Sequence, residues 1–94
     1  MPFAVVYHPQ VGDDLADIPR NMQERIESAI RIRLSLSPQN YGKPLAANLA
    51  GYWKLRVGDY RVVYKIVKNE VWVLGIINRR DVYKDIVKRL GWTP

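Results

Sequence analysis

The sequence predicts an α+β fold, and two patterns carry this prediction. Three apolar or alternating runs, at residues 52–57, 60–67 and 71–77, follow one another with short turns between them, as antiparallel strands do. Residues 20–36 instead repeat apolar side chains every three or four positions, which is the period of an amphipathic helix. The chain has no internal repeat, low-complexity tract or linker, so residues 1–94 are expected to form a single domain.

The N-terminal half is expected to contain one strand and two helices. Residues 3–7 are β-prone and are closed by Pro9. Residues 13–18 form a short amphipathic segment that begins with two aspartates and stops at Pro19, which suits a short helix. The longer helix at 20–36 exposes a polar side made of Gln23, Glu24, Glu27, Arg31 and Arg33.

The C-terminal half is expected to supply the rest of the sheet and a last helix. Residues 37–44 are dense in turn formers and predict a loop. The run at 71–77 is almost wholly apolar, as a central strand covered on both faces should be. Residues 81–90 predict a C-terminal helix. The order β-α-α-β-β-β-α then gives a four-stranded, mostly antiparallel twisted sheet with two helices packed on one face and a basic concave surface on the other.

The strands at 52–57 and 60–67 form a predicted β-hairpin with one cationic face. Val57-Gly58-Asp59 lies between them as a tight turn. Because side chains alternate along a strand, Trp53 and Leu55 point toward the core and their neighbours point away from it. The outward face carries Tyr52, Lys54, Arg56, Arg61 and Lys65. A second cationic group follows the last strand and contains Arg79, Arg80 and Tyr83.

The net charge of +6 is concentrated in the second half of the chain. Residues 1–42 have four basic and five acidic side chains, a net charge of −1, whereas residues 43–94 have eleven basic and four acidic ones, a net charge of +7. A one-sided basic field favours nucleic acid, an acidic partner protein or an anionic membrane surface. The alternative is that the charge serves solubility alone.

The sequence lacks the residues that several classes of catalytic and metal-binding site require. The chain has no cysteine, and His8 is its one histidine, which excludes a thiolate nucleophile, a histidine pair and a histidine-rich metal site. The carboxylates are scattered and no glycine-rich phosphate loop is present, so neither a metal nor another cofactor is expected. With no signal peptide and no apolar run long enough for a bilayer, we expect a cytoplasmic protein without a membrane partner.

Lysine, arginine and tyrosine can nevertheless cleave RNA without a metal. The neighbouring 2′-hydroxyl supplies the nucleophile, and the protein has to orient it, stabilise charge on the phosphorane oxygens and exchange protons. The planar fork of arginine binds two phosphate oxygens, and a phenol can transfer a proton or stack on an unpaired base. A passive binding patch or a solvated strand face has the same composition, and both readings stay open.

The chain also resembles the small toxins of the RelE/ParE superfamily, the toxic half of type II toxin–antitoxin pairs. The likeness covers nearly the whole chain and rests on the strand-helix-helix opening, the connector Gly-Lys-Pro-Leu…Leu-x-Gly, the hairpin Trp-Lys-Leu-Arg-Val-Gly-Asp-Tyr-Arg-Val-Val-Tyr and the terminal Arg-Arg-Asp-Val-Tyr. Toxins of the RelE-like branch are ribosome-dependent endoribonucleases, or mRNA interferases, that cut messenger RNA in the decoding site. The resemblance therefore implies metal-independent attack by the 2′-hydroxyl, with the ribosome and messenger RNA as partners. It also implies a cognate acidic, RelB-like antitoxin, and contact with operator DNA only through the antitoxin complex.

The resemblance further implies a role for each candidate residue. Lys54 is a candidate base or charge stabiliser, Arg61 and Arg79 would hold the scissile phosphate, and Tyr83 would stack on or orient the substrate. Further contacts with RNA are expected from Tyr52, Arg56, Lys65 and Arg80.

The resemblance leaves three alternatives open. Some members have lysine where this chain has Tyr52 and many have histidine where it has Asn78, so the general acid and base are not assigned. If the register at the end of the last strand is shifted by one residue, Arg80 instead of Arg79 holds the scissile phosphate. The activity itself has two rivals: a non-enzymatic ParE-like inhibitor of DNA gyrase, and an inactive relic that binds RNA or antitoxin. The terminal Arg-x-x-x-Tyr arrangement, which the ParE branch generally lacks, favours the ribonuclease.

Overall fold

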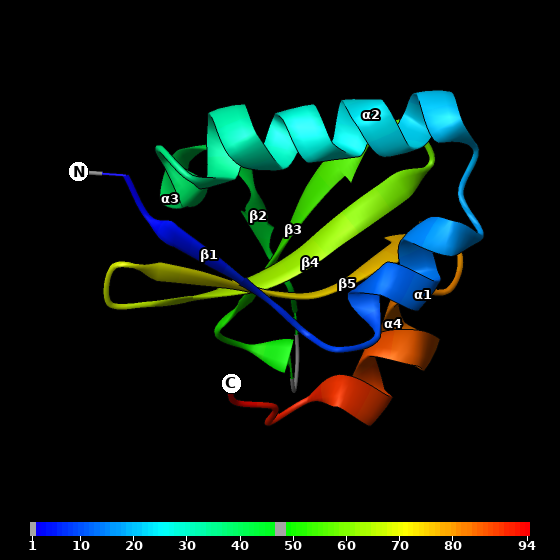
Figure 1. Ribbon diagram of the computed structural model, residues 1–94. Coiled ribbons are helices and arrows are strands. Elements are labelled where there is room, and N and C mark those ends of the chain that lie inside the picture. The colour runs from blue at the N-terminus through cyan, green and yellow to red at the C-terminus, as the bar shows by residue number, and fades with distance from the viewer. Residues whose placement is uncertain (1, 47–48) are drawn as a thin grey trace.

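The computed structural model describes residues 2–46 and 49–94, which form a five-stranded sheet with helices on both faces (Figure 1). The strands lie in the order β1-β5-β4-β3-β2, with β1 parallel to β5 and the other pairs antiparallel. They span Ala4–Tyr7 (β1), Lys43–Pro44 (β2), Tyr52–Val57 (β3), Tyr60–Val67 (β4) and Glu70–Asn78 (β5). The predicted α+β class and the mostly antiparallel sheet are confirmed.

The fifth strand comes from the segment that the sequence predicted as a loop. Residues 37–44 contain one helical turn, α3 (Pro38–Tyr41), and the two-residue strand β2, which pairs with the outer edge of β3. The buried hydroxyl of Tyr64 donates a hydrogen bond to the carbonyl oxygen of Pro38 at 2.7 Å. A side chain at Gly42 would overlap that hydroxyl. The prediction of four strands was therefore wrong, because a contact across 26 residues, invisible in local turn propensity, fixes this segment to the sheet.

Two helices cover one face of the sheet, as predicted. They are α1 (Val11–Ala16) and α2 (Arg20–Ala29), and α2 continues as the π-helix η1 (Ile30–Leu34). Figure 1 shows α2 lying along one side of the sheet, where it buries the apolar side of its predicted pattern. The main core between this layer and the sheet includes Ile26, Ile30, Leu34, Val62, Tyr64, Val71 and Val73. No helix within the described ranges is long and apolar enough to cross a membrane.

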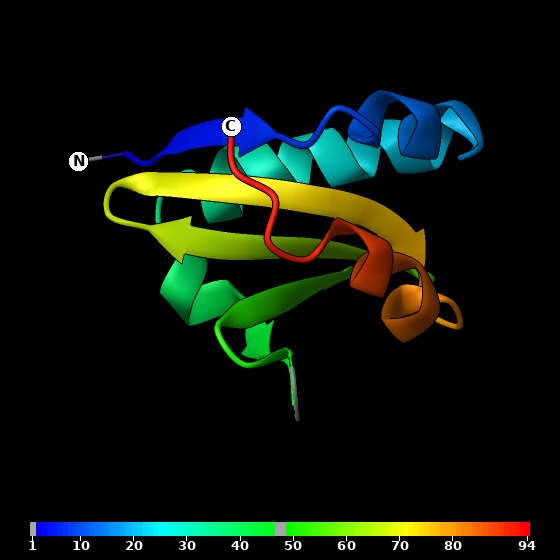
Figure 2. The ribbon, with the colours of Figure 1, turned by 90° about the horizontal axis from the view of Figure 1, so that it is seen from below.

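The C-terminal helix covers part of the opposite face. It consists of α4 (Val82–Ile86) and a final 3-10 turn, η3 (Val87–Arg89). Figure 2 shows α4 at one end of the sheet, with the C-terminal segment crossing in front of β5. A second, smaller core lies under it and contains Leu45, Leu49, Val63, Leu74, Ile77, Val82 and Ile86. The predicted basic surface therefore occupies only the part of this face that β3 and β4 form beyond α4.

A largely enclosed ion pair completes the free edge of β5. The strand has one extra residue, Leu74, because Val63 pairs with Gly75 while Tyr64 pairs with Val73. Beyond the last residue of β1, the Asp14 carboxylate accepts the N–H of Ile76 at 3.0 Å and Arg89 donates to the Leu74 carbonyl at 3.0 Å. Asp14 and Arg89 also bind each other through two hydrogen bonds, of 2.7 and 2.9 Å. Side chains thus take the place of a neighbouring strand here, and they join α1 to the C-terminal helix.

Candidate functional site

A basic cavity of about 290 Å³ lies where β2, β3 and β4 meet. The strand register brings its cations side by side: Lys43 is opposite Lys54, and Arg56 is opposite Arg61. Like charges directly opposite each other on a sheet are destabilising. The arrangement therefore concentrates positive potential at a cost in stability. The residues that line the cavity are Tyr41, Lys43, Lys54, Arg56 and Arg61.

Arg61 is the most constrained cation of this group. Its Nη1 donates to the carbonyl oxygens of Gly58 at 3.1 Å and of Tyr60 at 3.0 Å. Burial lowers the pKa of Arg61, and the nearby charges of Arg56 and Arg79 lower it further, whereas Asp59 acts in the opposite direction. An arginine keeps its charge at neutral pH in spite of such a shift. Arg61 is thus a fixed cation in the field of two others, and we call these three residues the arginine cluster.

Arg79 reaches the cluster because the hairpin turn holds its backbone. Gly58 has a φ of 59°, a left-handed conformation that glycine adopts readily, and it forms the tight turn together with Asp59. The N–H of Arg79 donates to the Asp59 carbonyl at 2.8 Å. The side chains of the two residues form a looser ion pair at 3.9 Å, with Arg79 61% and Asp59 76% exposed. An exposed pair of this kind contributes little to stability, so the guanidinium can exchange its carboxylate for another anion at small cost.

Arg80 has different surroundings from Arg79. Its N–H and its Nε donate to the side-chain oxygen of Asn78 at 3.1 and 3.3 Å. It lines a separate cavity, whose wall includes the carboxylates of Asp14, Asp17, Asp81 and Asp85. Arg79 therefore shares the field of Arg61, whereas Arg80 lies among acidic groups.

The remaining predicted residues lie outside the basic cavity. Tyr52 and Lys65 are opposite each other on β3 and β4, with the lysine Nζ 5.4 Å from the centre of the tyrosine ring. The hydroxyl of Tyr52 accepts the N–H of Gly91 at 3.1 Å, and its position four residues from Arg56 places it about 13 Å away along the strand. Tyr83 is 50% exposed on α4 and is not part of the cavity wall. The cavity wall thus brings together Lys54, Arg56 and Arg61, and Arg79 lies outside the wall but within the field of Arg61. Tyr52, Lys65, Arg80 and Tyr83 lie elsewhere.

Two residues of the cavity wall were not predicted. Tyr41 and Lys43 belong to the segment that was predicted as a loop. Arg33, expected on the solvent side of the long helix, lies with its guanidinium carbon 5.9 Å from the centre of the Tyr41 ring. The sequence feature that could have identified them is the occurrence of Tyr41 and Lys43 on either side of Gly42, shortly before the cationic hairpin.

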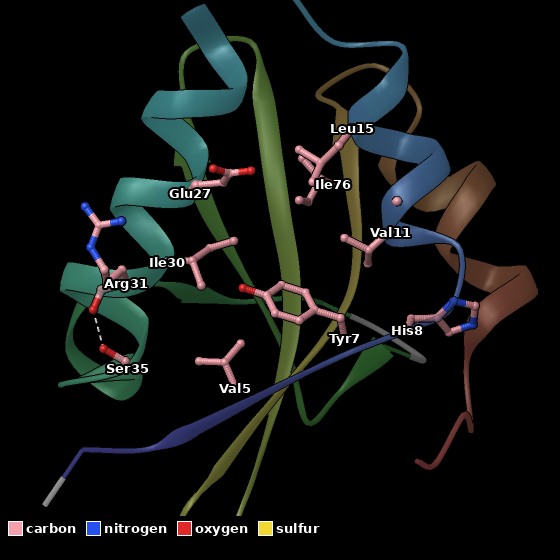
Figure 3. A pocket seen from close by; sticks show the side chains of 11 residues that line it. Val5, Tyr7, His8, Val11, Leu15, Glu27, Ile30, Arg31, Ser35 and Ile76 are labelled. Atoms are coloured by element: carbon pink, nitrogen blue, oxygen red, sulfur yellow. Dashed lines mark hydrogen bonds between the residues drawn. The ribbon is translucent and has the colours of Figure 1, made fainter. Parts of the chain in front are cut away.

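A second cavity, of about 580 Å³, lies on the other face of the sheet between β1, α1 and α2 (Figure 3). Tyr7 points across it toward the helix that carries Glu27, and burial together with that carboxylate raises the pKa of Tyr7. At the rim, the Ser35 hydroxyl donates to the Arg31 carbonyl. Mostly apolar side chains line it, and none of the predicted site residues is among them. This cavity is separate from the basic one.

The described ranges contain no group of three His, Asp or Glu side chains that could hold a metal ion. Asp14, the most enclosed carboxylate of the first helix, is engaged by Arg89. The chemical groups that the basic cavity offers are therefore ammonium, guanidinium and phenol.

Comparison with known proteins identifies the class to which this fold and site belong. A family model described as the ParE toxin of the type II toxin–antitoxin system parDE matches residues 5–83. Toxin RelG of Mycobacterium tuberculosis (strain ATCC 25618 / H37Rv) is 31% identical over 86 residues, which cover 89% of this chain and 99% of that protein. The chain belongs to the RelE/ParE superfamily of toxins from type II toxin–antitoxin systems.

Solved structures agree with this assignment. The toxin–antitoxin complex RelBE2 from M. tuberculosis contains a chain that matches with a TM-score of 0.78 and 30% identity, covering 86% of this chain and 95% of that one. A double mutant of E. coli toxin RelE in the free state matches with a TM-score of 0.76 over 96% of this chain and 99% of that one, at 18% identity, and shows the shared fold.

Proposed function

We propose that this toxin is a ribosome-dependent endoribonuclease that cleaves messenger RNA in the decoding site. The observation that carries the proposal is the arginine cluster beside Lys54, in which Arg61 is fixed by two carbonyls and surrounded by like charge. A phosphate that binds there relieves the repulsion between the guanidinium groups and accepts their charge-assisted hydrogen bonds. The relatives at about 30% identity, RelG and RelBE2, carry the names of the branch that cuts RNA.

The proposed reaction uses the side chains of the arginine cluster, Lys54 and Tyr83. The 2′-hydroxyl of one nucleotide attacks the adjacent phosphate, and the bond to the 5′-oxygen of the next nucleotide breaks, leaving a 2′,3′-cyclic phosphate and a 5′-hydroxyl. Arg61 and Arg79 stabilise the charge that develops on the phosphate oxygens, and Lys54 acts as base or as a further charge stabiliser. Tyr83 stacks on or orients the substrate from α4. Because the protein contributes no strong acid–base pair, the ribosome supplies the positioning of the 2′-hydroxyl.

The cognate partner in this proposal is an acidic, RelB-like antitoxin. The second half of the chain has a net charge of +7, which complements an acidic segment, and the matching chain of RelBE2 was solved in complex with its antitoxin. An antitoxin that covers the arginine cluster, or that displaces α4 together with Tyr83, stops cleavage without altering the core. Contact with operator DNA is made only through this complex, and the toxin acts in the cytoplasm.

Inhibition of DNA gyrase is the second candidate, and one observation favours it. The family model that matches residues 5–83 carries the ParE name. This candidate requires no bond cleavage in RNA, which makes the two activities experimentally distinct.

The test compares purified variants on ribosomes programmed with a defined message, with 5′ ends mapped after a short reaction. Arg61→Ala and Arg79→Ala should each lower the cleavage rate by about 10²–10³-fold, the usual effect of removing one stabiliser of transition-state charge. Arg20→Ala is the matched control, because this side chain is 91% exposed on α2. The wild-type protein should cut free RNA poorly.

Equal cleavage by all three variants would refute the assigned roles. Inhibition of gyrase supercoiling without new 5′ ends would replace the proposal by its alternative. Rapid cutting of free RNA would contradict the dependence on the ribosome.

A further inference from the structure

Tyr41 lies at the basic cavity with a largely exposed side chain. It is 52% exposed, in contrast to the buried Tyr64 that anchors the same segment. Its ring forms part of the cavity wall together with Lys43, Lys54, Arg56 and Arg61. The cavity therefore presents an exposed aromatic ring next to four cationic side chains.

The segment around Tyr41 is held firmly from both sides. On its N-terminal side, the Pro38 carbonyl is bound to the buried Tyr64 hydroxyl at 2.7 Å. On its C-terminal side, Lys43 pairs with Lys54 in the sheet. Gly42 between them lies against Tyr64 with no room for a side chain. Tyr41 is therefore presented by a fixed backbone and not by a free loop.

Arg33 lies over one face of the Tyr41 ring, with 5.9 Å between the guanidinium carbon and the ring centre. This contact comes from η1, where the wider π-helical turn interrupts the regular periodicity of the long helix. A guanidinium on one face stabilises the ring by a cation–π interaction and fixes its orientation. The half-exposed ring remains available on its cavity side for a second flat group.

We propose that Tyr41 is a stacking platform for a nucleobase of the RNA whose phosphate the arginine cluster holds. The inference deepens the proposed function, on which it rests, by assigning a base-binding position that the predicted site lacked. Unpaired bases stack on exposed aromatic side chains while cations bind the adjoining backbone, and the cavity offers both groups within about 290 Å³. Tyr41 lies next to β2, at one edge of the sheet, whereas Tyr83 belongs to α4, whose buried residues pack over β4 and β5. The two phenols therefore come from elements on opposite sides of β3, which carries Lys54 and Arg56.

The test measures binding of a single-stranded hexaribonucleotide that carries the fluorescent base 2-aminopurine, whose emission falls on stacking. Tyr41→Ala should weaken binding by roughly 5- to 150-fold, the equivalent of one lost base–aromatic stack, and should remove the quenching. Tyr41→Phe keeps the ring and should bind as the wild type does. Tyr7→Ala is the matched control, since Tyr7 is 47% exposed on the opposite face, and thermal unfolding checks that each variant is folded.

Unchanged binding and quenching in Tyr41→Ala would overturn the inference, and so would an equal loss in Tyr41→Phe. Loss of antitoxin affinity in Tyr41→Ala with RNA binding intact would assign this surface to the antitoxin and also overturn it. The proposed function is judged separately: a wild-type protein that stacks the RNA but cuts no message on the ribosome refutes the nuclease and leaves the platform in place.

Discussion

Replacing Asp14 with alanine should destabilise the protein severely. The Asp14 and Arg89 side chains are 12% and 11% exposed, and Asp14 accepts three hydrogen bonds, two from Arg89 and one from the Ile76 N–H. Its removal leaves the largely enclosed Arg89 guanidinium without a counter-ion and the Ile76 N–H without an acceptor, a loss of about 3–5 kcal/mol. A domain of 94 residues has a free energy of unfolding of about 5–14 kcal/mol, so the variant loses about a fifth of it or more.

Urea denaturation of the wild type and variants measures this loss. Asp17→Ala removes the same charge from an exposed position just after α1 and should stay within about 0.5 kcal/mol of the wild type. The double variant Asp14→Ala/Arg89→Met should recover only part of the stability, because it removes the unpaired charge but leaves the Ile76 N–H and the Leu74 carbonyl without their partners. A loss below about 1 kcal/mol in Asp14→Ala would refute the view that this pair closes the edge of β5.

Two further predictions concern acid stability and the antitoxin. Burial and the charge of Arg89 lower the pKa of His8, and Asp14 acts in the opposite direction. Below pH 6.5 the unfolded chain therefore binds a proton at His8 more readily than the folded chain does. The free energy of unfolding should therefore decrease as the pH falls from 7.5 to 5.5, and His8→Gln should reduce this pH dependence in urea titrations. An unchanged pH dependence in His8→Gln would show that His8 is not its cause. Hydrogen exchange with the cognate antitoxin should show protection of β3, β4 or the α4 segment. Protection confined to residues 10–36, which form the helical side of the cavity in Figure 3, would exclude the basic face as the docking surface.

The cationic side chains of the hairpin were predictable because they depend on local geometry. Alternation along β3 and β4 places Lys54, Arg56 and Arg61 on one face in any sheet that buries Leu55 and Val62. The separation of Arg79 from Arg80 was not predictable. It depends on the hydrogen bond between the Arg79 N–H and the Asp59 carbonyl and on the cap that Asn78 forms with Arg80, which only the folded strand end creates.

The sequence by itself determined the class of fold, the long helix, the three antiparallel strands and the basic character of one face, because each follows from a periodicity read over a few neighbouring residues. Tertiary structure decided the fifth strand, the ion pair of Asp14 with Arg89 and the place of Tyr41 beside the cations. In each case the decisive contact joins residues far apart in the chain: Tyr64 to Pro38, across 26 positions, and Arg89 to Asp14, across 75. Such contacts satisfy buried polar groups that no local pattern reveals, since their partners come together only when the core closes.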